Sequence, residues 1–342
     1  LKTQNFFSST TKITLTEYTP PYQLTEAIVN LLMQISESLL KWTSAIQGEL
    51  SPDLRRENRI KTIQASLAIE NNTLTVEQVT SILEGKRVVG LPQEITEVKN
   101  AIRAYENMPH CKSHSFEDLL QSHKLMMSGL TDDAGKLRVS GVGIYKDSDL
   151  IHMAPPADRV PFLIKDLLDW SKNSAAHPLL KSCVFHYEFE FIHPFSDGNG
   201  RMGRLWQTLL LSEWNNLLAY LPIETLIKKR QEQYYDVLAL CDAKGDSTDF
   251  IVFMLNAIHA ELNDGINDGI NDGIKLSLTD KGIINAITEN VEITIPELAT
   301  KLSKSERTIE RSIKKLKEQH CIKREGSRKA GYWRILGNKR VI

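Results

Sequence analysis

The twelve residues HPFSDGNGRMGR, from His193 to Arg204, constrain this chain more than any other segment. Apolar residues recur with roughly helical spacing on both sides of it: Leu180, Cys183, Val184, Tyr187 and Phe191 before it, and Met202, Leu205, Trp206, Leu209 and Leu210 after it. We therefore expect a loop between two buried helices that ends at a helix N-terminus. The first amides of a helix lack internal acceptors and the helix dipole adds positive charge, so this position favours anions.

The glycines and arginines of this segment suit a polyphosphate ligand. Gly198 and Gly200 let the backbone approach an anion closely, because neither carries a Cβ atom. Arg201 and Arg204 are three residues apart on the following helix, so their guanidinium groups lie on one face and can bind two phosphate groups. The segment therefore predicts a phosphate-binding site.

Two further residues of the segment supply chemistry beside a nucleotide. Asp197 offers the hard oxygen ligand that Mg²⁺ prefers. His193 is the only group of the segment whose residue type has an unperturbed pKa that suits a proton acceptor near neutral pH. With these residues in place, the segment resembles the signature of the Fic family, HPFxDGNGRxxR, at every fixed position. The resemblance implies a mostly α protein with a Fic-type helical core and a β-hairpin flap, which transfers AMP from Mg·ATP to a Ser, Thr or Tyr hydroxyl of a target protein.

The resemblance assigns a role to each matching position. His193 is the general base for the attacking hydroxyl, and Asp197 holds Mg²⁺ on the α- and β-phosphates. The residues that would bind ATP are Gly198, Asn199 and Gly200 as an anion cradle, Arg201 at the β-phosphate and Arg204 at the γ-phosphate. The related Doc-type kinases carry Lys at the position of Gly200 and bind the nucleotide reversed, so the glycine favours AMP transfer over phosphoryl transfer.

A second resemblance lies upstream, in the run SLAIEN. Family members that inhibit themselves carry (S/T)xxxE(G/N) on a helix, and Ser66, Glu70 and Asn71 match this motif. Ser66 and Glu70 are one helical turn apart, so the hydroxyl can hold the helix while the carboxylate reaches outward. The implied partner of Glu70 is Arg204, and their pairing would occupy the guanidinium that the γ-phosphate needs. ATP would then bind with its α-phosphate misaligned. A solvated surface glutamate is the alternative.

The stretch from about 139 to 154 resembles the flap of the family. β-Branched or alternating residues surround Lys146–Asp149, which suits a hairpin turn, and Pro155 and Pro156 then stop the strand. An exposed hairpin edge can pair with an extended segment of the target protein. A ribbon that only packs on helices is the alternative. Of the neighbouring Tyr234 and Tyr235, we expect one in the core and Tyr235 on the adenine side of the nucleotide site.

The chain divides into four expected segments. Residues 1–50 are helical, with an apolar stripe that suits packing on the catalytic helices or a homodimer surface. Residues 51–262 form the catalytic domain, with the inhibitory helix at about 56–71. The NDGI repeats in 263–278 predict an irregular linker, because glycine disfavours helix and Asn-Asp-Gly favours turns; a helix with a stripe of Ile at every fourth residue is the alternative. Residues 279–342 form a separate small domain.

The C-terminal segment, residues 279–342, has more Lys and Arg than Asp and Glu, whereas the chain as a whole has a formal net charge of −1. Its pattern resembles a winged helix-turn-helix domain. The recognition helix would span Ser305 to Gln319, and Arg328 and Lys329 would lie on the wing. These features make DNA one expected partner of the domain.

Three alternatives stay open beside self-inhibited AMP transfer. Glu70 would orient a water molecule if the net reaction were removal of AMP. The Fic core would only sense nucleotide if the protein were a transcription regulator acting through its C-terminal domain. Winged helices also bind proteins, and Glu306 and Glu310 on the predicted recognition helix would repel phosphate, so DNA and protein both remain candidate partners of this domain.

Other sequence features bear on metal binding, on disulfides and on the cellular location of the protein. His186, Glu190 and His193 have a spacing that could bind zinc, but no H-E-x-x-H pattern exists and we expect His186 to pack between helices. The four cysteines lack metal-site spacing, which suits free thiols in a reducing cytoplasm. No segment is apolar enough to span a membrane, and LKTQNFFSSTTK lacks the apolar core of a secretory signal. We therefore expect a cytoplasmic protein.

Overall fold

The computed structural model of the chain describes residues 18–45, 50–146, 149–272, 278–318, 321–326 and 331–336. The contacts within the chain define two compact units. One comprises residues 1–40 and 49–262, and the other comprises 263–342 together with 41–48. Each unit is described by itself below.

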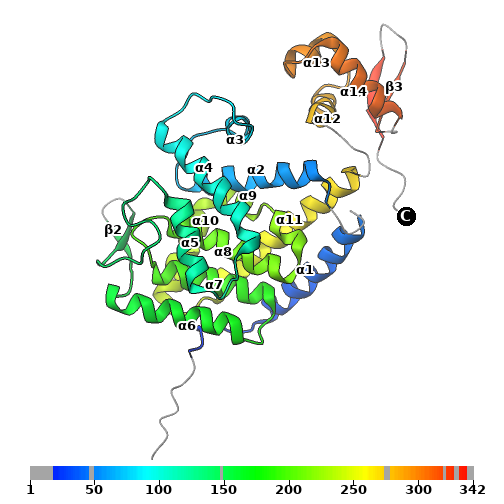
Figure 1. The fold of residues 1–342 in the computed structure, drawn as a ribbon. Helices are drawn as coiled ribbons and strands as arrows, with labels where there is room; N and C mark the ends of the chain where they lie inside the picture. Colours follow the sequence, from blue (N-terminus) through cyan, green and yellow to red (C-terminus); the bar gives the residue numbers. More distant parts are fainter. Residues whose placement is uncertain are drawn as a thin grey trace, which may run out of the picture. The chain divides into compact units, whose positions relative to one another are not determined.

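The first unit is built almost entirely of helices, as predicted (Figure 1). Two helices, α7 and α8, lie in its middle and pack against each other, with α2, α5 and α6 against them. The helices are α1 (Glu26–Ala45), α2 (Pro52–Ile69), α3 (Val76–Leu83), α4 (Pro92–Asn107), α5 (Phe116–Met127), α6 (Val160–Asn173), α7 (Pro178–Ile192), α8 (Asn199–Trp214), α9 (Ile223–Lys229), α10 (Gln231–Lys244) and α11 (Thr248–Asp272).

The two central helices form as the apolar spacing predicts. The side chain of His177 accepts a hydrogen bond from the Leu179 amide at 3.2 Å, and Pro178 occupies the first turn of α7, where its missing N–H costs nothing. Almost every residue of α7 is buried, and the apolar face of α8 packs on it. Each fully buried large apolar side chain contributes roughly 1.5–3 kcal/mol. The expected loop between two buried helices therefore has rigid ends.

Helix α2 begins earlier than the predicted 56–71. Ser51 caps its N-terminus, because the hydroxyl accepts the Leu54 amide at 3.2 Å, and Pro52 follows as the first helical residue. The helix ends at Ile69, with Glu70 as its C-cap residue. The next residue, Asn71, has φ 66°, a left-handed conformation that Asn and Gly tolerate best. This conformation explains physically why the motif ends in Gly or Asn.

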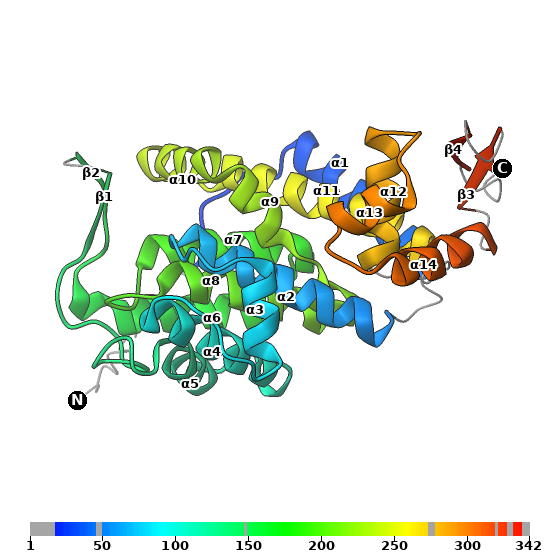
Figure 2. The ribbon, with the colours of Figure 1, turned by 90° about the horizontal axis from the view of Figure 1, so that it is seen from above.

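The hairpin consists of β1 (Gly143–Lys146) and β2 (Asp149–Met153), paired antiparallel with an irregularity between Ile144 and Tyr145. It extends away from the helices (Figure 2). It is shorter than the predicted 139–154, because Val139 lies outside the strands and is 94% exposed. Two residues of the expected turn, 147 and 148, lie outside the described residues.

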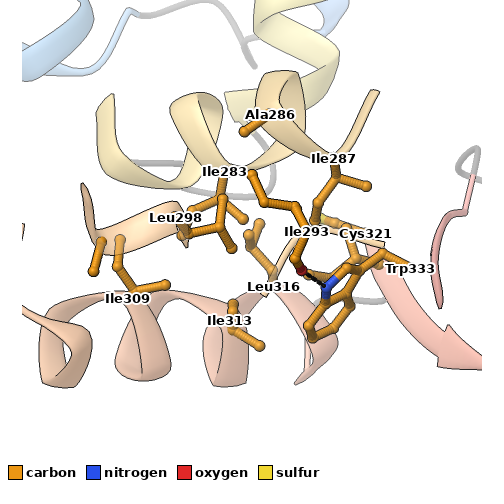
Figure 3. Close-up of a cluster of buried hydrophobic side chains, with 12 residues drawn as sticks. Ile283, Ala286, Ile287, Ile293, Leu298, Ile309, Ile313, Leu316, Cys321 and Trp333 are labelled. Carbon is orange, nitrogen blue, oxygen red and sulfur yellow. Dashed lines mark hydrogen bonds between the residues drawn. The ribbon is translucent and has the colours of Figure 1, made fainter. Parts of the chain in front are cut away.

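The second unit has the predicted winged-helix elements: α12 (Leu278–Glu289), α13 (Ile295–Lys301), α14 (Glu306–Glu318), β3 (Ile322–Glu325) and β4 (Tyr332–Ile335). Its apolar core joins the three helices to both strands (Figure 3). Trp333 closes one end of the core and donates from Nε1 to the Ile293 carbonyl at 2.9 Å. The predicted wing residues Arg328 and Lys329 lie outside the described residues.

The NDGI segment differs from the irregular linker expected at 263–278. Helix α11 continues through Asp272. The helix is established upstream, where its buried face packs in the first unit through residues such as Met254 and Ile258. Adding residues to an existing helix avoids the cost of nucleation, so the penalty of about 1 kcal/mol for each glycine is tolerated. Residues 273–277 lie outside the described part of the chain.

The four cysteines are free, and Cys183, Cys241 and Cys321 are buried. Burial raises the pKa of the Cys183 thiol to about 12, which makes this thiol unreactive at neutral pH. Among the helices that the structure describes, none combines the length and the apolar character that crossing a membrane requires.

Candidate functional site

His193 is the C-cap residue of helix α7 and lines a cavity beside the predicted motif. Its backbone is left-handed, with φ 50° and ψ 63°, so the chain turns sharply at this residue. The Nδ1 atom lies 3.2 Å from the carbonyl oxygen of Glu190. A carbonyl oxygen only accepts, so this hydrogen bond assigns the proton to Nδ1 and the lone pair to Nε2. The imidazole is therefore oriented as a base through Nε2.

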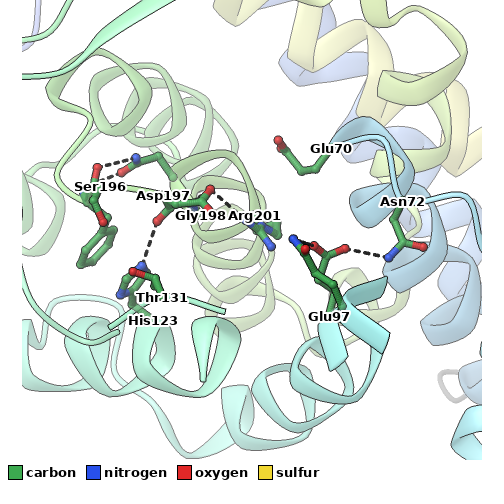
Figure 4. A network of polar contacts seen from close by, with 12 residues as sticks. Glu70, Asn72, Glu97, His123, Thr131, Ser196, Asp197, Gly198 and Arg201 are labelled. Carbon is green, nitrogen blue, oxygen red and sulfur yellow. Dashed lines mark hydrogen bonds and ion pairs between the residues drawn. The ribbon is translucent and has the colours of Figure 1, made fainter. Parts of the chain in front are cut away.

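His123 of α5 forms a hydrogen bond to the loop after His193 (Figure 4). The Nδ1 atom of His123 accepts the Gly135 amide at 2.8 Å, so Nε2 carries the proton and donates to the Asp197 carbonyl at 3.0 Å. The ring also stacks on Phe195, with centroids 3.6 Å apart. Burial lowers the pKa of His123, which favours this neutral form. Sequence reasoning missed His123, because nothing near it in the chain marks a role.

Asn199 acts on the loop itself. Its side chain accepts the Phe195 amide and donates to the Phe195 carbonyl, both at 2.9 Å, and it is 2% exposed. These two bonds close the loop. The Asn199 side chain, which was predicted as part of the anion cradle, therefore binds the backbone of the loop. The first amides of α8, which follow Gly198, have no acceptor within the helix, so this N-terminus suits an anion.

Gly198 is required at the N-cap of α8 for two reasons. Its φ is 83°, and a Cβ atom there would lie 2.6 Å from the Met127 sulfur. Arg201, one turn later, is 5% exposed, and its buried Nε has no hydrogen-bond partner among the described residues. An unpaired buried donor beside a helix N-terminus is costly unless an anion binds there, so this atom fits a phosphate group.

Asp197 has one carboxylate oxygen engaged and one available for a metal ion. Its Oδ1 accepts the Gly198 amide at 2.6 Å and Arg201 Nη2 at 2.9 Å. The side chain is 62% exposed, and no bond to Oδ2 is present among the described residues. Mg²⁺ beside a nucleotide commonly takes one or two carboxylates, with phosphates and water as its other ligands. The residues present therefore fit Mg²⁺.

Arg204 and α2 make the contact that the SLAIEN motif predicts. The Nε atom of Arg204 donates to Ser66 Oγ at 3.0 Å, and Nη2 donates to the Ser66 carbonyl at 3.0 Å and to Glu70 Oε1 at 2.7 Å. Burial opposes the charge of Arg204, but the combined effect of Glu70, Tyr234 and Glu190 outweighs it and raises the pKa of the guanidinium. Arg204 is 2% exposed, so α2 supplies much of its polar environment.

Gly200 leaves the space that the carboxylate of Glu70 occupies. A Cβ atom at this position would lie 2.6 Å from Glu70 Oε1 and 3.0 Å from Arg204 Nη1. Any larger residue at position 200 therefore requires Glu70 or Arg204 to shift.

The end of α2 is also held from α9 and α10, which sequence reasoning missed. Lys228 Nζ donates to the Ala68 carbonyl at 2.6 Å, and Gln231 Nε2 donates to the Ile69 carbonyl at 2.8 Å. Lys228 also donates to Gln231 Oε1 at 2.7 Å. A cation at a helix C-terminus satisfies carbonyls without internal partners and complements the helix dipole. These contacts fix the position of Glu70, the next residue.

The cavity beside these groups has a volume of about 780 Å³, with Glu70, His193 and Arg204 in its wall. Tyr235 lines it and is 43% exposed, whereas Tyr234 is 2% exposed. Tyr234 is therefore the core residue of this pair. Phe191, predicted in the core, is 37% exposed and lines the cavity, because it lies on the open side of α7. Aromatic walls beside a phosphate site suit a nucleobase.

His186 packs between helices, as predicted. It is fully buried, with Nδ1 2.6 Å from Gln207 Oε1 and Nε2 3.1 Å from the Tyr234 hydroxyl. Burial lowers the pKa of His186 to about 4, so it is neutral. Within the described residues, no three His, Cys, Asp or Glu side chains are arranged to hold a metal ion.

Comparisons with known families support both units. A family model described as the Fic/DOC family matches residues 113–211, and one described as winged helix-turn-helix DNA-binding matches residues 276–323. The chain is 28% identical over 251 residues to "Protein adenylyltransferase fic-1" of Caenorhabditis briggsae, covering 68% of this chain and 47% of that protein. It is also 28% identical over 219 residues to "Protein adenylyltransferase Fic" of Aedes aegypti, covering 61% and 42%. The chain spans less than half the length of these relatives.

Solved structures extend the likeness over nearly the whole chain. The C. elegans Fic-1 structure shares the fold, with a TM-score of 0.58 at 21% identity over 73% of this chain and 74% of that chain. A crystal structure of a Fic family protein from Desulfovibrio desulfuricans G20 is 48% identical, with a TM-score of 0.71, over 95% of this chain and 100% of that chain. The resemblance carried by HPFSDGNGRMGR is thereby confirmed, and the chain belongs to the Fic family.

Proposed function

We propose that this protein is a protein adenylyltransferase that holds itself inactive through Glu70. The observation that carries the proposal is the meeting of three groups at one cavity: His193, the N-terminus of α8 with Arg201 and Arg204, and Glu70. The names of the curated relatives support AMP transfer as the reaction.

In the proposed reaction, His193 Nε2 accepts the proton of a Ser, Thr or Tyr hydroxyl of the target protein. The hydroxyl oxygen then attacks the α-phosphorus of ATP. The bond from the α-phosphorus to the oxygen that bridges to the β-phosphate breaks, and pyrophosphate leaves with that oxygen. AMP stays on the target as a phosphodiester. The Nδ1 bond to the Glu190 carbonyl supports this role, because it stabilises the imidazolium that forms.

ATP would be held by residues that already carry partial or full positive charge. The first amides of α8 and the unpaired Nε of Arg201 would bind the β-phosphate, and Arg204 the γ-phosphate. Tyr235 would lie beside the adenine. Asp197 would hold Mg²⁺, which when bound neutralises charge on the α- and β-phosphates. The target would pair with the edge of the β1–β2 hairpin.

Inhibition follows from competition for Arg204. A carboxylate 2.7 Å from Nη2 occupies the position that a γ-phosphate oxygen would take and repels that phosphate. ATP then binds without its γ-phosphate contact, and its α-phosphate is not aligned with His193. The buried contacts of Ser66 to the same guanidinium keep α2 in this inhibiting position.

The experiment that tests the function uses the Glu70→Gly chain with Mg·ATP carrying label on either the α- or the γ-phosphate. We expect protein-bound label from α-labelled ATP only, in the chain itself or in a cell lysate. The matched control is Glu70→Gly with His193→Ala. Label from γ-labelled ATP would instead indicate phosphoryl transfer. Faster release of AMP from a pre-labelled protein by wild type than by Glu70→Gly would favour the removal reaction.

A second function has support in the C-terminal unit. Helix α14 buries Ile309, Ile313 and Leu316, and at 100° per residue the opposite face carries the exposed residues Arg307, Arg311 and Lys314. Glu306 and Glu310 lie to one side of this basic row, whereas the exposed Glu318 lies within it at the end of the helix. We propose that residues 279–342 bind DNA through this row.

Fluorescence anisotropy with a labelled DNA duplex tests this second proposal. Replacing Arg307 and Arg311 by Ala should weaken binding to all sequences and reduce its salt dependence, since phosphate contacts are lost. The matched pair Glu306→Ala and Glu310→Ala should strengthen binding. No salt-dependent affinity in the intact chain would assign this surface to a protein partner instead.

A further inference from the structure

Arg138 precedes the hairpin and binds the turn that carries the proposed base. Its side chain is buried, with the residue 3% exposed. The Nε atom donates to the His193 carbonyl at 2.7 Å, and Nη2 donates to the Ile192 carbonyl at 3.3 Å. The backbone N–H of Arg138 donates to the Pro194 carbonyl at 2.9 Å. One residue therefore binds three consecutive carbonyls at the end of α7.

The same guanidinium binds both ends of the hairpin segment. Its Nη1 donates to the Ser140 carbonyl at 2.9 Å, before β1, and its Nη2 donates to the Pro155 carbonyl at 2.5 Å, after β2. A guanidinium is planar and rigid, and its donors point in set directions. Arg138 therefore fixes the base of the hairpin relative to the turn of His193.

Hydrogen bonds to carbonyl oxygens offset the cost of burying the guanidinium of Arg138. Among the residues that the structure describes, no carboxylate forms an ion pair with Arg138. Its partners are carbonyl oxygens, and two of them lie at the C-terminal end of α7, where the helix dipole favours a positive charge. Lysine would bring the charge but not the fork of donors that reaches the helix end and both ends of the hairpin.

We propose that Arg138 is a positioning residue for AMP transfer, which sets the distance between a target segment paired along the hairpin and Nε2 of His193. The inference rests on the proposed function. Arg138 is not itself part of the cavity wall and reaches it only through the backbone carbonyl of His193, and it bonds to none of the predicted phosphate-binding residues. Its loss therefore affects the alignment of the acceptor hydroxyl and leaves the binding of ATP unchanged.

The test compares Arg138→Gln, Arg138→Lys and the control Arg159→Gln, each in the Glu70→Gly chain. Arg159 is exposed and lies shortly after the hairpin, so its replacement makes the same charge change without the buried contacts. The probe is α-labelled Mg·ATP, and self-labelling is measured over a range of ATP concentrations. We expect Arg138→Gln to lower the limiting rate roughly 10- to 100-fold, because small misplacements of reacting groups have effects of that size.

Three further results are expected from the same measurement. The ATP concentration for half-maximal rate stays the same in Arg138→Gln, Arg138→Lys recovers part of the rate, and Arg159→Gln matches its parent. An unchanged limiting rate in Arg138→Gln overturns the proposal. The proposal is also overturned if Arg138→Gln changes only the ATP concentration for half-maximal rate, or if Arg138→Lys loses as much of the limiting rate as Arg138→Gln does.

Hydrogen exchange separates this inference from the proposed function and from misfolding. If the Glu70→Gly parent transfers no label, the proposed function fails, and amide exchange in Gly143–Met153 decides the role of Arg138. Faster exchange there in Arg138→Gln, with exchange in α8 unchanged, supports the positioning role. Unchanged exchange in the hairpin, or equal acceleration throughout the first unit, overturns it.

Discussion

Glu70 and Arg204 join the end of α2 to the second turn of α8 across 2.7 Å, although 133 residues separate them in the chain. Arg204 is almost completely buried, whereas the Glu70 side chain is 34% exposed toward the cavity. The pair is therefore anchored on the arginine side and accessible on the glutamate side. The carboxylate of Glu70 is therefore more accessible to a ligand in the cavity than the guanidinium of Arg204.

Replacing Glu70 by Gly should raise AMP transfer by about tenfold or more. Each 1.4 kcal/mol by which Glu70 disfavours correctly aligned ATP lowers the population of that complex tenfold, and the replacement removes this effect. Self-labelling with α-labelled ATP measures the change. Glu70→Gln is the matched variant, because it keeps the size and removes the charge, and it should activate as well. Equal labelling by all three folded proteins would leave Glu70 without an inhibitory role.

Replacing Lys228 by Met should also activate, more weakly, because Lys228 binds the Ala68 carbonyl at the end of α2 and not the phosphate site. Loss of one charged hydrogen bond costs about 1.5–3 kcal/mol, but Gln231 still binds the Ile69 carbonyl, so we expect only part of that effect, a several-fold rise in labelling. Lys229→Met is the control, because Lys229 is exposed on the same helix. Equal labelling rates in Lys228→Met and Lys229→Met would show that Lys228 does not stabilise the inhibiting position of α2.

Replacing His193 by Ala in the Glu70→Gly background should lower transfer by about 10²–10⁴-fold, the usual contribution of a general base. Isothermal calorimetry should give the same ATP affinity, because the predicted phosphate contacts lie on α8. His193→Asn serves as the second variant, since Asn tolerates the left-handed backbone at φ 50°. Activity retained by both variants would remove His193 from the mechanism.

Asp197→Ala and Arg201→Ala should separate metal from phosphate binding, although the two side chains pair at 2.9 Å. Asp197→Ala should lose the dependence of transfer on Mg²⁺ concentration together with most activity, because the carboxylate ligand is gone. Arg201→Ala should weaken ATP binding itself, because its directional charged contacts cannot be replaced by a neighbour. Unchanged ATP affinity in Arg201→Ala, measured by calorimetry, would contradict the phosphate assignment.

Replacing Glu188 by Gln should remove a pH-dependent loss of stability. Burial raises the pKa of Glu188 from 4.5 to about 7, although the Tyr18 hydroxyl donates to its Oε2 at 2.6 Å. Between these values the folded protein keeps a proton that the unfolded chain has lost, so the free energy of unfolding falls as pH rises through this window.

The free energy of unfolding of Glu188→Gln, minus that of wild type, should therefore increase from about pH 4.5 to about pH 7 and level off above it. The full change is about 3 kcal/mol at 1.36 kcal/mol per pKa unit. Urea denaturation at a series of pH values measures it. The neutralisation of His186 occurs in both proteins and cancels in the difference. A constant difference across this range would show that Glu188 is ionised in the folded state.

The groups that carry local signals were predictable. The spacing of apolar residues predicted α7 and α8, and the glycines and charges between them predicted an anion site. The motif resemblance predicted the pairing of Glu70 with Arg204, which no local pattern implies. The prediction of an irregular linker at the NDGI segment was wrong for the residues up to Asp272. The composition of the segment favours turns, but the packed helix upstream extends into it.

By itself, therefore, the sequence determined the two central helices, the loop between them and the charged groups of the motif, including His193 and Arg204 in the cavity wall. Only the tertiary structure decided what holds those groups in place. Arg138 and Lys228 bind backbone carbonyls, and His123 binds a backbone amide and a carbonyl. Every residue has a carbonyl, so such partners leave no mark in the sequence, and folding alone determines which of them meet a given side chain.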